Sequence, residues 1–417
     1  MKAVIAGLVV ALSASAAHAA DVRILWYSDG VEGEVMKDLL SRFHEQNPDI
    51  NVTLDNVAFQ VVREQLPIQL EAGQGPDIAR VTELKPLSRH WLDLTPYLKN
   101  VEGFEAAYGD QLDWMRPDNS DIIPGFMTQI TLSSGFANKT LFDRAGVALP
   151  GEGATWDQWM EAARTVAASQ QVPIPAAIDR SGHRISGPNL SFGANYIAVD
   201  GSPAPVDAGV RAFTEKFVGW NRDGTINPEV WVTAAGTTYR AAAEDFVNGQ
   251  VAFYYSGSWQ IPNFSRQIGD AFDWVATGSP CGPSACTGIP GGAGLVAVKY
   301  TKEPEAVARV MEYLASEPVA REFAARSLFL PANKAVRDSG VEYRTEDPQV
   351  AAALEKLLAA QKTTSDEAQR LPGWRWSSAY YGALVNRVSQ VIAGELSFDQ
   401  AYARIDVDVR DAVAAAQ

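Results

Sequence analysis

Trp259 is the residue whose type and position first point to a chemical role. It ends the stretch FVNGQVAFYYSGSW, in which an apolar and aromatic run closes on Gly257 and Ser258. A buried strand normally finishes in small polar residues, so we expect this indole to face a cleft. Its flat face would then meet C–H groups of a bound ring, and the backbone N–H groups around Gly257 would meet polar groups. The alternative is an indole that covers the edge of a core.

Polar side chains also follow two expected strands. Tyr27, Ser28 and Asp29 come directly after VRILW, and Thr82 and Glu83 come directly after PDIARV. Open α/β sheets bind ligands at the carboxyl ends of their strands, so we expect these residues at one site. The two carboxylates would accept hydrogen bonds from ligand hydroxyl groups. The alternatives are solvated loop carboxylates or helix caps.

Cys281 and Cys286, in the stretch CGPSAC, are the two cysteines of the chain. In an oxidising compartment they are expected to close a small disulfide loop. The alternative, a pair of metal ligands, lacks partners, because His44, His90 and His183 lie far apart in the sequence. No metal and no cofactor is expected.

The first nineteen residues, MKAVIAGLVVALSASAAHA, have the form of a secretory signal peptide. Lys2 precedes an apolar core, and small residues close on Ala19 in an A-x-A cleavage pattern. The apolar core is too short to span a bilayer, and no later segment has about 18 unbroken apolar residues. Residues 1–19 are therefore predicted to be removed, and the product is expected in a bacterial periplasm with no direct membrane insertion.

Composition limits the class of protein. The chain has 417 residues, and beyond about 250–300 residues a single core stops growing, so two domains are expected. A hydrophobic content of 47% excludes a disordered chain. The formal net charge of −15 argues against nucleic acid and anionic membranes as partners, since both require a basic face. The alternative explanation of this charge is simple solubility.

Alternating strands and helices predict an α/β fold with a parallel sheet. Strands are expected at 22–28, 50–57 and 76–82, separated by helices over 32–46 and up to residue 73. Pro67 is expected to kink the second helix or to open its main body.

A second α/β block begins near residue 130. Thr155 and Gln158 form a predicted capping box at the start of a helix. Residues 181–207 are rich in Gly, Ser, Asn and Pro and are predicted to be a surface loop. The last 70 or so residues are predicted to be helical from their apolar stripes.

Five blocks in order carry a family resemblance: GQGPDI, GFANKTLFDRAGV, FVNGQVAFYYSGSW, GGAGLVAVKYTKEPEAV and FLPANKAV. Together they resemble the bacterial extracellular solute-binding proteins of the carbohydrate-uptake type, the maltose-binding-like partners of ABC importers. The resemblance covers the chain after the signal peptide almost from end to end.

The resemblance implies a type II periplasmic binding protein fold, with two α/β lobes that each hold a mainly parallel sheet flanked by helices. It places residues 20–127 and 290–335 in lobe 1 and residues 128–289 and 336–417 in lobe 2, with the ligand cleft between them. The chain would cross between lobes near residues 126–132 and 291–296.

The resemblance also implies a function. The protein would capture a mono- or oligosaccharide by lobe closure and deliver it to the transmembrane subunits of an ABC permease, as a monomer and without catalysis. Two alternatives stay open: a secreted glycoside hydrolase that uses a carboxylate pair such as Asp29 and Glu83, and a protein that reports ligand to a membrane sensor.

Further contacts follow from the same resemblance. Gln129, beside Thr128, lies on the first crossing, and Gly292 would let a ligand approach the backbone closely. Family members bring an aromatic residue over the cleft from a region that holds Trp374 and Trp376 here, so one of these indoles is expected to face inward.

The charge of the ligand depends on three arginines. An acidic sugar would require Arg80, Arg180 or Arg184 to turn toward it, because an anion prefers paired N–H contacts. We expect a neutral saccharide, and we expect the charges of Arg180, His183 and Arg184 to lie on an exposed loop.

Overall fold

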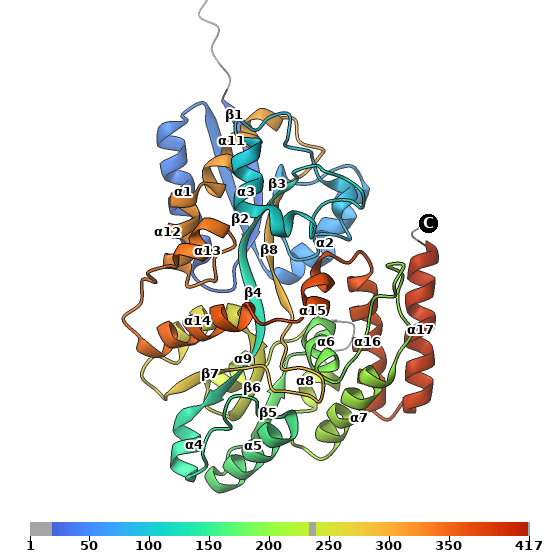
Figure 1. Ribbon diagram of the computed structural model, residues 1–417. Helices are drawn as coiled ribbons and strands as arrows, with labels where there is room; N and C mark the ends of the chain where they lie inside the picture. Colours follow the sequence, from blue (N-terminus) through green and yellow to red (C-terminus); the bar gives the residue numbers. More distant parts are fainter. Residues whose placement is uncertain (1–18, 233–238, 416–417) are drawn as a thin grey trace, which may run out of the picture.

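Eight strands form the centre of the part of the chain that the computed structural model describes, residues 19–232 and 239–415. Their order is β2-β1-β3-β8-β4-β6-β5, and β7 pairs with β4 beside this path (Figure 1). The strands are β1 (Ala20–Tyr27), β2 (Ile50–Val57), β3 (Ile78–Val81), β4 (Gly125–Asn138), β5 (Ile174–Ile178), β6 (Val251–Gly257), β7 (Trp274–Gly278) and β8 (Pro290–Ala297).

Two strands connect the halves of the molecule. β4 and β8 pair antiparallel from Gly125 opposite Val296 to Leu132 opposite Pro290. β8 also pairs with β3 in one half, while the far end of β4 pairs with β6 and β7 in the other. Every residue of β4 is buried, because side chains from both halves cover it. These strands run through the waist between the two lobes (Figure 1).

The two-lobed α/β architecture is confirmed, but the strand directions are mixed. β1 runs parallel to β2 and β3, and β5 runs parallel to β6. The pairs β3–β8, β4–β8, β4–β6 and β4–β7 are antiparallel. The expectation of mainly parallel sheets therefore needs correction, because the two connecting strands run against their neighbours in each lobe.

Two separate hydrophobic clusters define the lobes. The first, the core of the first lobe, draws on residues from Val22 to Ile130 and from Ala293 to Ala332. The second, the core of the second lobe, draws on residues 136–289 and 350–409, together with Leu328 and Leu330. Because Leu330 accepts a hydrogen bond from the Ile130 N–H at 3.0 Å, this segment forms a third connection between the lobes.

Helices cover both faces of each half (Figure 1). Those of the first lobe are α1 (Glu32–Gln46), α2 (Phe59–Glu71), η1 (Ser88–His90), α3 (Val101–Leu112), α11 (Pro304–Ala315), α12 (Glu317–Ser327) and α13 (Lys334–Ser339). Those of the second lobe are α4 (Lys139–Ala145), α5 (Trp156–Gln170), α6 (Gly182–Ser191), α7 (Ala208–Arg222), α8 (Glu229–Val232), α9 (Ala243–Val247), η2 (Ser258–Gln260), α10 (Ile261–Gln267), α14 (Pro348–Gln361), α15 (Asp366–Arg370), η3 (Leu371–Gly373), α16 (Ser377–Ile392) and α17 (Phe398–Ala415).

One predicted loop is a helix instead. The segment GHRISGPNLS forms α6 with Pro188 inside it, and nine of its ten residues are buried. Low intrinsic helix propensity is overridden here by packing, since α6 lies between α7 and α16. The prediction of a surface loop over 181–207 is therefore wrong for its first part. Elsewhere α1 matches its predicted span, and α2 passes through Pro67 without ending.

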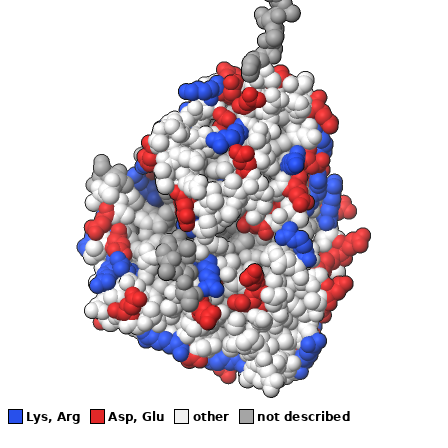
Figure 2. All heavy atoms as spheres, turned by 180° about the vertical axis from the view of Figure 1, so that it is seen from behind, with Lys and Arg blue, Asp and Glu red and all other residues white. Residues whose placement is uncertain are grey.

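The predicted signal peptide, residues 1–19, lies outside the described residues except for Ala19. Among the residues described, no helix combines the length and the apolar character needed to cross a membrane. Acidic and basic side chains are interspersed on the face shown in Figure 2, on a chain whose formal net charge is −15.

Candidate functional site

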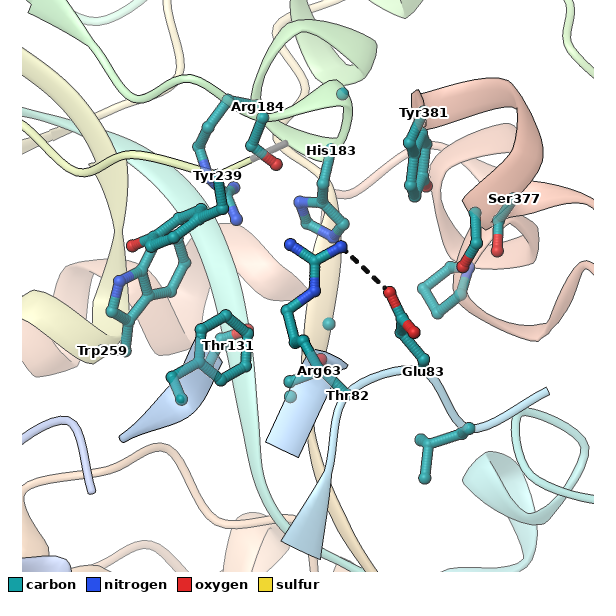
Figure 3. A pocket seen from close by; sticks show the side chains of 18 of the residues that line it. Arg63, Thr82, Glu83, Thr131, His183, Arg184, Tyr239, Trp259, Ser377 and Tyr381 are labelled. Atoms are coloured by element: carbon teal, nitrogen blue, oxygen red, sulfur yellow. Dashed lines mark hydrogen bonds and ion pairs between the residues drawn. The ribbon is translucent and has the colours of Figure 1, made fainter. Parts of the chain in front are cut away.

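A cavity of about 300 Å³ lies between the two lobes. The first lobe contributes the carboxyl ends of β1 and β3 and the start of α2, and the connecting strands form its floor. The second lobe contributes the starts of α6 and α16 and the corner after β6 (Figure 3). Seven of the eleven residues predicted as ligand contacts line it: Tyr27, Asp29, Thr82, Glu83, Gln129, Trp259 and Gly292.

Ser28 and Gly257 were also predicted as contacts, and the structure corrects both. Ser28 does not line the cavity, and its hydroxyl donates to Asn56 Oδ1 at 3.2 Å. Gly257 is buried beneath the neighbouring indole, because a Cβ at this position would lie 1.8 Å from Trp259 Cζ3. Its lack of a side chain therefore makes room for Trp259 rather than for a ligand.

Neither Trp374 nor Trp376 lines the cavity, so the expectation that one of them faces inward needs correction. Trp374 is buried in the second core, where its Nε1–H donates to the Gly201 carbonyl at 2.9 Å. Trp376 packs against the same core, with the Arg375 guanidinium 4.6 Å from its ring centroid. From the same region Tyr381 lines the cavity instead.

Four aromatic side chains form a row across the cavity from one lobe to the other. Tyr27 packs on Phe59 at a centroid distance of 4.8 Å, and Phe59 meets the edge of Tyr239 at 5.7 Å. Tyr239 in turn lies beside Trp259 in the cavity wall (Figure 3). Trp259 follows a strand of the second lobe yet packs against the first core. The Arg184 guanidinium lies 4.2 Å from its ring centroid, so one face of the indole is already covered.

Asp29 lies at the edge of a buried charge network. Arg80, which is fully buried, donates to Glu32 at 3.0 Å and approaches the Asp29 carboxylate at 3.6 Å. The Asp29 side chain keeps 27% of its surface exposed. Burial raises the pKa of Asp29 to about 7, against the lowering effect of Arg80, and Glu32 adds to the rise.

Glu83 lines the cavity in a pair with Arg63. The Arg63 Nη2 donates to Glu83 Oε1 at 3.1 Å, and both side chains are about one quarter exposed (Figure 3). Arg63 lies in the second turn of α2, the helix that follows β2. Arg63 and Phe59 were not predicted from the sequence. A signal was present, because a helix that follows a strand begins at the carboxyl edge of the sheet, where ligands bind.

Of the three arginines considered for an acidic ligand, Arg184 lines the cavity. Arg80 is buried behind it, and Arg180 Nε donates to the Trp231 carbonyl and the Ser389 hydroxyl outside it. Arg184 follows His183 in the first turn of α6, and both line the cavity. Arg180 and Arg184 are buried and His183 is half-buried, so the expectation of exposed loop charges is wrong for all three residues.

His183 is neutral in this environment. Its Nε2 lies 3.1 Å from the Pro290 carbonyl, an acceptor, so Nε2 carries the proton and Nδ1 carries a lone pair. Burial and the nearby positive charge of Arg184 hold the pKa of His183 well below its usual range. No partner for Nδ1 exists among the described residues.

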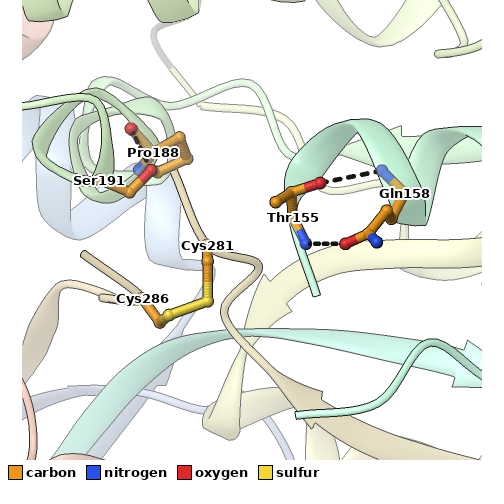
Figure 4. Close-up of a disulfide and its surroundings, with 6 residues drawn as sticks. All are labelled: Thr155, Gln158, Pro188, Ser191, Cys281 and Cys286. Carbon is orange, nitrogen blue, oxygen red and sulfur yellow. Dashed lines mark hydrogen bonds between the residues drawn. A yellow bond between two sulfur atoms is a disulfide. The ribbon is translucent and has the colours of Figure 1, made fainter. Parts of the chain in front are cut away.

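A disulfide joins Cys281 to Cys286 at the far end of α6 (Figure 4). The loop that it closes donates to the last carbonyl of the helix, from Ser284 N to Ser191 O at 2.9 Å. Cys281 also hydrogen-bonds the start of α5, where Thr155 and Gln158 form the predicted capping box. Within the described part of the chain, no group of three His, Cys, Asp or Glu side chains could hold a metal ion.

A family model for bacterial extracellular solute-binding proteins matches residues 27–321. A putative binding protein of Brucella abortus is 22% identical over 403 residues, covering 89% of this chain and 88% of that protein. The maltodextrin-binding protein of Bacillus subtilis is 29% identical over 143 residues, which cover 31% of this chain and 34% of that protein.

Solved structures are similar over nearly the whole chain. The GacH receptor of Streptomyces glaucescens, solved unliganded and with acarbose, has a TM-score of 0.79 at 16% identity and covers 94% of this chain and 98% of its own. A substrate-binding protein of Listeria monocytogenes in complex with cycloalternan has a TM-score of 0.79 at 16% identity, with coverages of 95% and 99%. Similarity at this level of identity establishes the shared two-lobed fold.

Proposed function

This chain belongs to the bacterial extracellular solute-binding proteins, and from that membership we propose that it captures a small saccharide between its lobes for uptake by an ABC importer. The family is extracellular, so the protein acts outside the cytoplasm. The carbohydrates bound by its structural relatives, acarbose and cycloalternan among them, support a sugar as the ligand.

The observation that carries the proposal is the composition of the inter-lobe cavity. A sugar offers hydroxyl groups and flat patches of C–H groups, which need polar side chains and aromatic faces respectively. Asp29, Glu83 and Gln129 supply the polar groups, and Trp259 and Tyr239 supply aromatic surface. Because one face of Trp259 lies under Arg184, a sugar ring would use the surface that the guanidinium leaves open.

The size of the cavity favours a ligand of one or two sugar rings. Its volume of about 300 Å³ lies at the low end of the roughly 300–1,000 Å³ typical of ligand sites. A ligand that contacts both lobes stabilises the arrangement in which they meet. Capture is then a shift of the protein population from the open to the closed form. The ligand can shift this equilibrium only by the difference between its binding free energies for the closed and open forms.

Delivery requires a partner in the membrane. We propose that the closed protein, as a monomer in the periplasm, docks on the transmembrane subunits of a permease and releases the sugar there. Each of the two lobes would present one surface to that partner, with α13 (Lys334–Ser339) on the first lobe, across the boundary predicted at residue 335. Transport energy would come from an ATPase subunit, because the sequence has no GxxxxGK[ST] loop.

Thermal-shift screening against a saccharide library, followed by calorimetry, tests the proposal. A ligand that binds the folded state raises the melting temperature, by an amount that grows with its concentration. We expect at least one mono- or disaccharide to do so, and Trp259→Ala to weaken its binding. Trp376→Ala is the matched control, since this indole also lies under an arginine but outside the cavity. Equal losses in both variants would argue against the site.

Turnover of aryl glycosides is the second measurement. Asp29 and Glu83, the carboxylates that a glycoside hydrolase would need, both line the cavity. We expect no sustained release of the aryl group at low protein concentration. Catalytic release would contradict the proposal of a binding protein.

A further inference from the structure

The N-terminus of helix α6 opens onto the cavity without a cap. Ser181 occupies the N-cap position, makes no side-chain capping hydrogen bond and lines the cavity with the next three residues. The N–H groups of Gly182 and His183 have no acceptor within the helix, and none is found among the described residues. Such a terminus carries a partial positive charge that favours an anion.

A second helix begins at the same place. α16 has Trp376 at its N-cap position, again without a side-chain cap, and Ser377 and Ser378 of its first turn line the cavity (Figure 3). The two helices meet closely, because a Cβ on Gly182 would lie 2.3 Å from Tyr381 Cα. Both helix dipoles therefore raise the electrostatic potential on this side of the cavity.

Arg184 adds a full positive charge beside these termini. It is 7% exposed and lines the cavity, its Nη1 donates to the Ser133 hydroxyl, and its Nε has no partner among the described residues. The Arg184 guanidinium stacks on the face of Trp259, and this cation–π contact stabilises the buried charge in part. No described carboxylate pairs with it. Asp179, the carboxylate that acts on the Arg184 charge, instead accepts hydrogen bonds from two hydroxyl groups and a backbone N–H.

The other charges at the cavity are matched. Arg63 pairs with Glu83 at 3.1 Å, and Arg80 pairs with Glu32 while it approaches Asp29. A buried cation that lacks a directly paired anion is costly, and an anion supplied by a ligand would remove that cost.

We infer that the ligand carries a carboxylate, held by the Arg184 guanidinium and the uncapped N-terminus of α6. The inference rests on the proposed saccharide binding and narrows it to a sugar acid. The planar guanidinium matches a carboxylate in a paired geometry. Arg184 is the cation without a carboxylate partner among the described residues of the cavity, because Arg63 pairs with Glu83. One such cation in about 300 Å³ suits one carboxylate better than a doubly charged phosphate.

The opposite side of the cavity fits the rest of such a ligand. The carboxylates of Asp29 and Glu83, from the first lobe, accept hydrogen bonds from hydroxyl groups. A uronic acid carries hydroxyl groups around its ring and its carboxylate as the exocyclic C6 on C5. The carboxylate can therefore meet Arg184 while ring hydroxyl groups farther from C5 reach Asp29 and Glu83.

Calorimetry with matched pairs tests the inference. The pairs are glucuronate and glucose, galacturonate and galactose, and the corresponding disaccharides, with glucose 6-phosphate as a separate arm. We expect the tightest ligand to be an acid that binds at least about tenfold tighter than its neutral parent, since charge-assisted hydrogen bonds are the strong ones. Equal affinity for acid and parent, or a preference for the phosphate, would overturn it.

Variants of Arg184 and Arg180 test which residue causes the preference for the acid over its neutral parent. Arg184→Gln should remove the preference for the acid, whereas Arg180→Gln should keep it, because Arg180 is equally buried but lies outside the cavity. If Arg184→Gln fails to fold, Arg184→Lys is the second variant. It keeps the positive charge but lacks the paired N–H donors of the guanidinium, so it should retain part of the preference for the acid. An unchanged preference in a folded Arg184→Gln variant would overturn the inference.

The two proposals fail in different ways. Binding of neutral saccharides alone would contradict the acid subsite and leave the proposed function standing. Binding of no saccharide, neutral or acidic, would contradict the proposed function and this inference with it.

Discussion

Replacing Gly257 by alanine should displace the indole of Trp259. The backbone tolerates the change, because φ is −175° at this residue, an extended value open to any side chain. The added Cβ, however, would lie 1.8 Å from Cζ3 and 2.2 Å from Cη2 of the indole. Carbon atoms pack at about 3.5–4.0 Å, so the ring must move by roughly 2 Å.

The displacement has two costs. Overpacking of this kind destabilises proteins by about 1–3 kcal/mol. A ring that leaves its position also loses the stacking of Arg184, now 4.2 Å from the ring centroid, which is worth about 0.5–2 kcal/mol. We therefore expect Gly257→Ala to lower the free energy of unfolding by about 1.5–5 kcal/mol and to weaken ligand binding.

Urea denaturation followed by circular dichroism measures the effect, and Gly219→Ala is the control. Gly219 lies in α7 with open space around its Cα, so a methyl group there should stabilise the helix by about 0.5–1 kcal/mol. In a Trp259→Ala background the ring is gone, and Gly257→Ala should cost almost nothing. An equal cost in both backgrounds would refute the reasoning.

Three other predictions follow from the same contacts. Gly182→Ala should destabilise the protein by about 3 kcal/mol or more in a thermal melt, because the new Cβ meets backbone atoms of Tyr381 and must separate two helices. The pKa of Asp29 is about 7 in the folded protein, above the ordinary value of about 3.9. Between these pH values the folded state binds more protons than the unfolded state, so the free energy of unfolding falls as the pH rises from about 4 to about 7. Asp29→Asn should remove this fall, a difference on the order of 2 kcal/mol by urea denaturation at pH 8, and parallel pH profiles would contradict it. Reducing the Cys281–Cys286 disulfide should lower stability by about 2 kcal/mol from the entropy of its short loop, and a variant with serine at both positions should no longer respond to reductant.

Local pattern was sufficient to predict much of the first lobe. The apolar stripe of α1 and the alternation of β2 correspond to their observed spans, because periodicity within a short window sets which face is buried. The positions of Asp29 and Glu83 at strand ends followed from the general geometry of α/β sheets, and both line the cavity.

The second half of the site depended on long-range packing. Trp374 and Trp376 were the expected cavity residues of this region, but both pack on the second core. Tyr381, about one helical turn after Trp376, lines the cavity instead. Which face of α16 points inward is set by its contact with α6, which no local signal records.

The sequence by itself determined the family, from blocks spread along the chain, and it determined the first strands and helices of the first lobe and the cavity positions of Asp29 and Glu83, which depend on local pattern. The tertiary structure alone decided that GHRISGPNLS is a helix and that Arg184 faces the ligand cavity. The physical reason is burial: a segment with poor helix propensity becomes helical when neighbouring elements exclude water from its backbone, and its first turn then points where those neighbours direct it.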